Sequence, residues 1–147
     1  MNFDELRSIY QLPELDVLKQ EFEIKEDEEH LIRHIRRKIA GLLDNYISLL
    51  EEVIHPDPSS PKVMHESNHF TPEKRQELTK LYKQLMSLYR IATRAGVSRK
   101  DADDMEFITK TLENWHDIKT QMISVVAVME NSWNSSAKEQ EEVAYLG

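Results

Sequence analysis

Three long segments of the sequence place apolar residues alternately three and four positions apart. The first stripe consists of Ile32, Ile35, Ile39, Leu42, Tyr46, Leu49 and Val53; the second of Leu78, Leu81, Leu85, Leu88 and Ala92; the third runs from Ala102 through Met105, Ile108, Leu112, Trp115, Ile118, Met122, Val125 and Met129 to Trp133. This spacing keeps side chains on one face of an α-helix and lacks the strict alternation of a half-buried strand. The sequence therefore predicts three long helices with coiled-coil-like apolar faces.

The residues that flank these stripes set the expected ends of the helices, at about 27–54, 72–95 and 98–134. Thr71 and Pro72 suit the N-cap and first position of the second helix. Gly96 is expected to end that helix, and Ser98 with Asp101 resembles a capping box for the third. Gly41 lies inside the first helix, where it either allows close approach of a neighbouring helix or is simply tolerated at a small cost.

Shorter elements are expected around the long helices. Residues 1–24 show apolar spacing for one or two short helices, and Pro13 suits the first turn of the second. A continuous helix from Pro13 into the first long helix is the alternative. Residues 55–70 hold three prolines and three histidines and are expected to form a long loop, whereas the acidic segment 135–147 is expected to fray or form a short turn.

Composition agrees with a helical fold. The 147 residues include only three glycines and five prolines, which leaves few residues for the turns of a β-rich protein. A chain of this length suits a single core. We expect one all-α domain over residues 1–147, an antiparallel bundle of three long helices and one or two short ones.

The location of the protein is expected to be cytoplasmic. The chain has no cysteine, so it has neither a disulfide framework nor a thiolate site. Its first residues are acidic and lack the apolar region of a secretory signal. The longest uncharged apolar stretch, 120–129, is about half the length of a membrane span. No membrane association is therefore expected.

Charge is unevenly distributed along this acidic chain of net charge −8. Segment 72–100 has two acidic and eight basic residues, whereas 1–31 and 101–147 each have ten acidic and three basic residues. The candidates for contact with nucleic acid or a protein partner in the basic segment are Lys83, Arg90, Arg94 and Arg99. The favoured interpretation is that this basic surface pairs with acidic segments of the same chain or a partner, and nucleic-acid binding is the alternative.

Metal-dependent catalysis is a weaker alternative. His30 and His34 are one helical turn apart, and Glu113 with His116 forms one Glu-x-x-His element, which di-iron helical bundles use twice. The apolar face of helix 72–95 offers no carboxylate to complete such a site. A second possible cluster consists of His55, His65 and His69, and the pairs Glu26 with Glu29 and Asp101 with Asp104 have spacing suited to a Mg²⁺-dependent pyrophosphohydrolase. Acidic residues are common at helix starts in any case. We therefore expect no metal, no cofactor and no enzymatic activity.

The far end of the third helix is apolar almost all round. A helix of that kind must be covered, either by the N-terminal segments or by a second copy of the chain. The second arrangement is favoured, and its expected interface consists of Met122, Ile123, Val125, Val126, Met129 and Trp133. The sequence thus predicts a non-enzymatic homodimer that acts through protein–protein contact.

Overall fold

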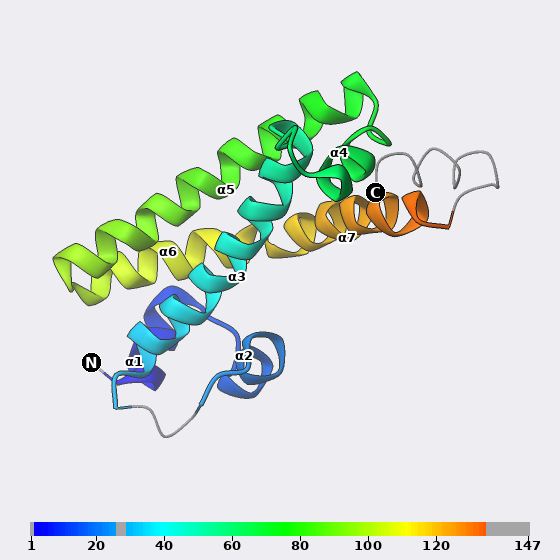
Figure 1. Ribbon diagram of the computed structural model, residues 1–147. Helices are drawn as coiled ribbons and strands as arrows, with labels where there is room; N and C mark the ends of the chain where they lie inside the picture. The colour runs from blue at the N-terminus through cyan, green and yellow to red at the C-terminus, as the bar shows by residue number, and fades with distance from the viewer. Residues whose placement is uncertain (1, 26–28, 135–147) are drawn as a thin grey trace. The chain divides into compact units, whose positions relative to one another are not determined.

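The computed structural model of the chain describes residues 2–25 and 29–134, and this part of the chain is all-helical. Its helices are α1 (Phe3–Tyr10), α2 (Leu15–Phe22), α3 (Leu31–Ile54), α4 (Pro61–Ser67), α5 (Pro72–Ser98), α6 (Asp101–Glu113) and α7 (Trp115–Ser132) (Figure 1). The described residues contain no strand. The prediction of an all-α helical bundle is confirmed, while the expected behaviour of residues 135–147 lies outside the described part.

The helices form two compact units. The first comprises the described residues of segments 1–45 and 85–115, and the second those of segments 46–84 and 116–147. The single domain expected over residues 1–147 stays a prediction, and each unit is described by itself.

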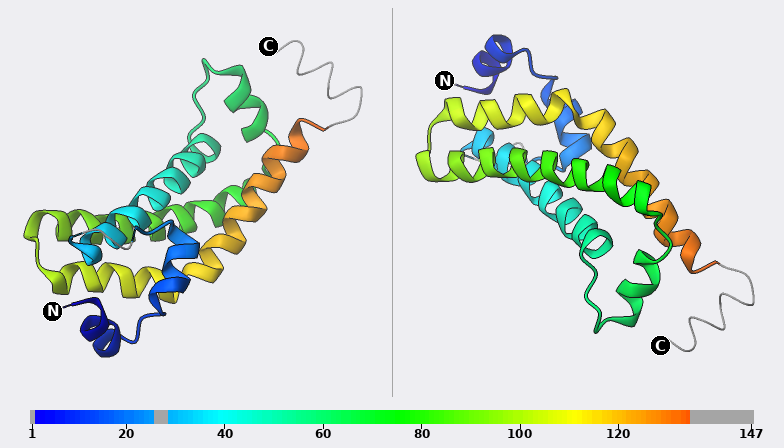
Figure 2. Two further views of the ribbon diagram at one scale, coloured as in Figure 1. Left: turned by 90° about the horizontal axis from the view of Figure 1, so that it is seen from below. Right: turned by 90° about the horizontal axis from the view of Figure 1, so that it is seen from above.

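The first unit contains α1, α2, α6 and parts of α3 and α5. Within it, α6 runs back alongside α5 after a short turn, as the views of Figure 2 agree. A capping box between Asn2 and Glu5 starts α1. The ring of Phe22 on α2 lies 5.0 Å from that of Trp115, whose indole Nε1 donates to Glu21 at 2.7 Å. The short N-terminal helices are thus confirmed, and α2 ends at Phe22 rather than continuing into α3, because Glu23 adopts a left-handed conformation (φ 55°).

The second unit joins α4, α7 and the remaining parts of α3 and α5. α4 occupies residues 61–67 of segment 55–70, which was expected to form a long loop, so the prediction is wrong for these residues. The helix forms because Ser60 accepts a hydrogen bond from the backbone N–H of Val63 and Pro61 stands at the first helical position. Arg75 then fixes the next turn by donating to the Ser67 carbonyl at 2.6 Å.

The buried stripe of α3 departs from the predicted alternation of three- and four-residue steps in the middle of the helix. Seven of its residues are buried: Ile32, Ile35, Ile39, Leu43, Ile47, Leu50 and Val53. Leu42, Tyr46 and Leu49, which a seam of alternating three- and four-residue steps would bury, are only half-buried. The buried stripe instead takes successive four-residue steps from Ile35 to Ile47, and these steps leave the three residues at its edge. The stripe of α5 is buried as predicted.

The third predicted helix, 98–134, is two helices. α6 ends at Glu113 and α7 begins at Trp115, with Asn114 between them at φ −107° and ψ 2°. The Asn114 side-chain amide donates to the Lys110 carbonyl at 2.9 Å. Asparagine interrupts helices in this way because its side chain competes for backbone hydrogen bonds.

Gly96 does not end α5. The helix continues to Ser98, and Arg99 takes the left-handed position (φ 56°) that glycine was expected to fill. Ser98 also caps no helix: α6 begins after Lys100, and the Ser98 hydroxyl donates to Asp103 instead. A Cβ atom at Gly96 would lie 3.4 Å from Nη1 of Arg36, so this glycine faces an arginine of α3.

Arg99→Gly is expected to stabilise the protein by about 1 kcal/mol, because a side chain in the left-handed region costs roughly that much and glycine does not incur it. Chemical denaturation with unchanged m-value would measure the gain. Lys100→Gly, at a residue with φ −95°, is the matched control and should give no gain. Equal effects of the two substitutions would contradict the explanation.

Gly41 lies on α3 with open space beside its Cα atom. A Cβ atom there would meet no atom of the described residues within 4 Å, so no neighbouring helix requires the glycine. Gly41→Ala is therefore expected to raise the free energy of unfolding by about 0.5–1 kcal/mol, the helix-propensity difference. Thermal melting would show it as a higher Tm, and a lower Tm would mean that the site does not tolerate a methyl group.

Candidate functional site

An apolar groove crosses the surface of the second unit between α7 and α3. From α7 it is lined by Lys119, Met122, Ile123, Val126, Ala127 and Glu130, and from α3 by Tyr46 and Leu49. Its volume is about 330 Å³. Tyr46 and Leu49 are half-buried at the edge of the α3 stripe and form this side of the groove.

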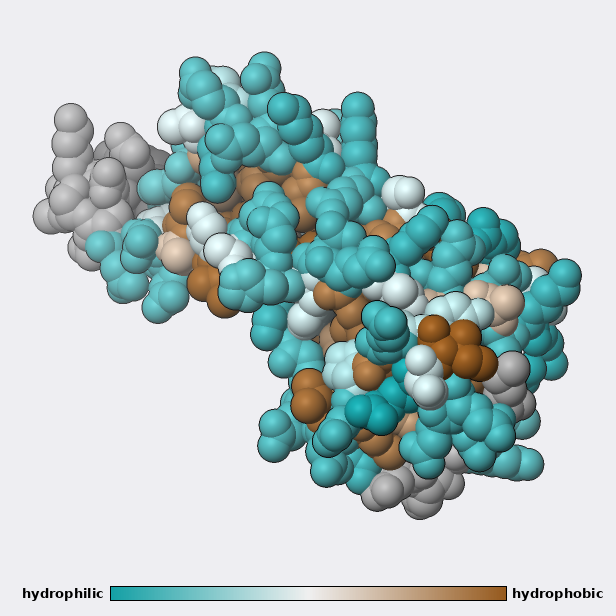
Figure 3. All heavy atoms as spheres, turned by 180° about the vertical axis from the view of Figure 1, so that it is seen from behind, coloured by the Kyte–Doolittle hydropathy of each residue, from teal (hydrophilic) through white to brown (hydrophobic). Residues whose placement is uncertain are grey.

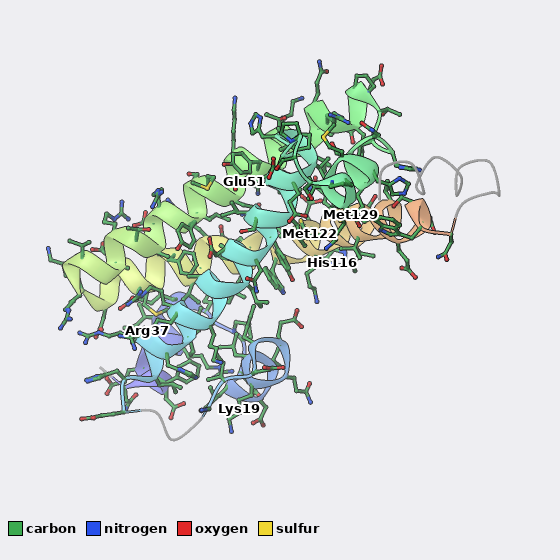
Figure 4. The ribbon with its side chains drawn as sticks, viewed as in Figure 1. Lys19, Arg37, Glu51, His116, Met122 and Met129 are labelled. Atoms are coloured by element: carbon green, nitrogen blue, oxygen red, sulfur yellow. The ribbon has the colours of Figure 1, made fainter. Side chains whose placement is uncertain are left out.

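The structure divides the six residues predicted as an interface into two groups. Met122, Val125 and Met129 are buried, and two of them are labelled on α7 in Figure 4. Ile123, Val126 and Trp133 remain 69%, 45% and 41% exposed. Polar residues cover most of the face seen in Figure 3, where apolar residues reach the surface in separate patches. The exposed members of the predicted interface are therefore the ones available to a partner.

Trp133 has local contacts beyond the end of α7. Its ring lies 4.3 Å from that of His65 on α4, and its indole Nε1 donates to Glu66 at 3.0 Å. The Nε2 atom of the buried His65 is 2.9 Å from the carbonyl of Ser132, the last residue of α7. A polar side chain thus satisfies a helix-end carbonyl that has no partner within the helix.

The possible histidine cluster has structural contacts instead of a shared cation site. The His65 and His69 rings lie 4.7 Å apart, and Nδ1 of His69 is 2.8 Å from the His65 carbonyl. Each of these histidines therefore directs a ring nitrogen to a backbone oxygen. His55 is exposed just after α3.

The other metal candidates have separate environments. His34 Nε2 accepts a hydrogen bond from the Lys25 backbone N–H at 3.1 Å. His30 is exposed before α3, Glu113 ends α6, and His116 is exposed on α7. Across residues 2–25 and 29–134, no three histidine or acidic side chains are grouped as metal ligands would be. Of the pair Glu26 with Glu29, Glu26 lies outside these ranges.

A buried ion pair in the first unit was missed by the sequence reasoning. Arg36 of α3 donates through Nε to Oδ1 of Asp104 on α6 at 2.6 Å, and the Asp104 side chain is fully buried. Burial raises the pKa of this carboxyl, although the hydrogen bond and charge of Arg36 act in the opposite direction. Asp104 precedes Ile108 by four residues and so continues the apolar stripe backward, which is the signal that could have revealed it.

The candidates in the basic segment have mixed environments. Lys83, Arg90 and Arg94 are exposed along α5, and the guanidinium of Arg90 lies 5.7 Å from the centre of the Tyr89 ring. Arg94 pairs with Glu106 and, at 4.0 Å, with Asp103 of α6. The Arg99 carbonyl accepts a hydrogen bond from Arg33. Pairing of Arg94 within the chain agrees with the favoured interpretation of the charge pattern, and nucleic-acid binding stays an untested prediction.

Comparison of the chain with protein-family models, with curated proteins and with solved structures finds no match. Among the described helices, none combines the length and apolar character that crossing a membrane requires. The candidate site therefore rests on the groove itself.

Proposed function

We propose that this protein acts through protein–protein contact, as a homodimer whose subunits meet at the groove between α7 and α3. The observation that carries the proposal is the exposure of Ile123 and Val126 beside the half-buried Tyr46 and Leu49. Apolar side chains gathered in a groove favour a partner that removes them from water, at about 25 cal/mol per Å² of buried apolar surface.

The polar residues at the ends of the groove fit a contact between proteins. Lys119 and Glu130 lie at opposite ends of its α7 side, with apolar residues between them. An apolar centre with a charged rim is the usual arrangement of a protein interface. The metal-dependent catalytic alternative has less support, because no three metal-ligating side chains converge within the part of the chain that the structure describes.

Light scattering across a concentration series tests the proposal. The monomer mass is 17.3 kDa, so a homodimer should give about twice that value at high concentration and move toward the monomer on dilution. A mass that stays at the monomer value throughout would overturn the homodimer proposal. Sedimentation velocity at the same concentrations would separate a compact dimer from larger aggregates.

A further inference from the structure

The six α7 residues that line the groove are spaced symmetrically about one point. They occupy positions 119, 122, 123, 126, 127 and 130, and the midpoint of this set falls between Ser124 and Val125. Reversing the direction of the helix about that point superimposes the set on itself. A surface with this property can meet its own copy across a two-fold axis, because such an interface uses the same patch on both subunits.

We propose that two copies of the chain pair through antiparallel α7 helices, with the two-fold axis at the level of residues 124 and 125 and passing between Ile123 and Val126 on the groove face. This inference rests on the proposed function, the homodimer, and adds its arrangement. The exposed residues nearest the axis then lie opposite each other: Ile123 faces Val126 of the partner subunit, and the symmetry repeats this pair. A large side chain meets a smaller one in this pair, as interdigitating helices require.

Charge at the ends of the groove selects the antiparallel direction. In this arrangement Lys119 lies opposite Glu130 of the partner subunit, and the symmetry repeats the pair at the other end. Parallel pairing in the same register would instead place lysine against lysine and glutamate against glutamate. Opposite charges on the flanks of paired helices set their orientation, and like charges disfavour the alternative.

The remaining lining residues complete the contact from α3. Tyr46 and Leu49 stand on the other wall of the groove, so side chains that enter it touch α3 as well as α7. A second α7 presents apolar side chains to this space, because Ile123 and Val126 are exposed on it. The two-fold axis means that each copy fills the groove of the other.

Exchange of the two end charges tests the direction of pairing. Lys119→Glu alone and Glu130→Lys alone each place like charges at both ends, and each should raise the dimer Kd roughly tenfold. The double variant restores opposite charges and should return the Kd to that of the wild type. An equimolar mixture of the two single variants should form a heterodimer. Single variants that dimerise as well as the wild type would overturn the antiparallel arrangement.

Chemical cross-linking provides an independent measurement, because the chain has no natural cysteine. With the axis at 124–125, the two copies of residue 126 are offset by roughly 4.5 Å along the helix axis, and those of residue 116 by roughly 25 Å. A short bis-maleimide should therefore link Val126→Cys subunits but not His116→Cys subunits. Both positions are exposed in the separate subunit, so each thiol is accessible to the reagent while subunits exchange between monomer and dimer.

The outcomes separate this inference from the homodimer proposal. Linkage at 126 alone, together with a dimeric mass, supports the antiparallel arrangement. Linkage at both positions, or at neither while the mass is dimeric, overturns the arrangement and leaves the homodimer in place. A monomeric mass for the unmodified protein overturns both.

Discussion

Arg36→Met is expected to lower the free energy of unfolding by about 3–5 kcal/mol at pH 7, because it leaves the Asp104 carboxylate buried without its cation. The side chain of Arg36 is 12% exposed and that of Asp104 0%, so water does little to replace the lost partner. Within the described residues, Oδ2 of Asp104 already has no hydrogen-bond partner. Arg36 is thus the main compensation for this buried charge.

The loss should depend on pH in a defined direction. Because burial raises the pKa of Asp104 above its ordinary 3.8, the folded protein holds this proton more tightly than the unfolded chain does. The corresponding stability is fully present below pH 3.8 and is lost as the pH rises through the pKa of the folded protein. Removal of Arg36 raises that pKa further, so the difference between variant and wild type should grow from pH 4 to pH 7.

Matched variants identify the cause. Arg36→Met combined with Asp104→Leu removes the charge together with its partner, and should recover most of the stability. Arg37→Met, at the adjacent exposed position, should change the unfolding free energy by less than about 0.5 kcal/mol. Urea denaturation of all three variants at pH 4 and pH 7 gives the comparison. A pH-independent loss that the second substitution does not reverse would assign the effect to packing alone.

The same pair illustrates how far the sequence could predict the fold. The apolar periodicity located the long helices, since burial of one stripe per helix follows from a repeat of three and four residues. Asp104 continues such a stripe, but a carboxyl at a helix start is equally well explained by the helix dipole. Only the position of Arg36 on another helix distinguishes the two explanations, and that is tertiary information.

The interruption and the ends of helices were harder to predict from the sequence, because they too depend on individual contacts. The helix interruption at Asn114 depends on one side-chain hydrogen bond to Lys110, and a single asparagine inside an apolar periodicity is often tolerated. The left-handed conformation fell on Arg99 although Gly96 stood three residues earlier. In the groove, the sequence identified the apolar end of α7, but it could not separate Val125, which is buried, from Val126, which is exposed.

Glutamate substitutions at three consecutive positions of α7, 124, 125 and 126, test the distinction between buried and exposed residues of this helix. Val126→Glu is expected to raise the dimer Kd by roughly a hundredfold or more, because it places an unpaired carboxylate in the apolar groove of both copies. The fold should persist, since the side chain is already 45% exposed within the subunit. Light scattering should then give the monomer mass at concentrations where the wild type is dimeric.

The neighbouring positions are the controls. Val125→Glu introduces the same charge at a side chain that is 0% exposed, and should destabilise the subunit itself by about 4 kcal/mol or more. Ser124→Glu adds it at an exposed position that does not line the groove, and should alter neither Tm nor mass appreciably. Loss of assembly in the Val126→Glu variant would assign Val126 to the interface. Loss of folding in the Val125→Glu variant would assign Val125 to the core, and an unchanged Ser124→Glu variant would assign Ser124 to the solvent-exposed surface. A dimeric Val126→Glu variant with wild-type Kd would exclude the groove as the interface, because burial of a carboxylate there would weaken the dimer.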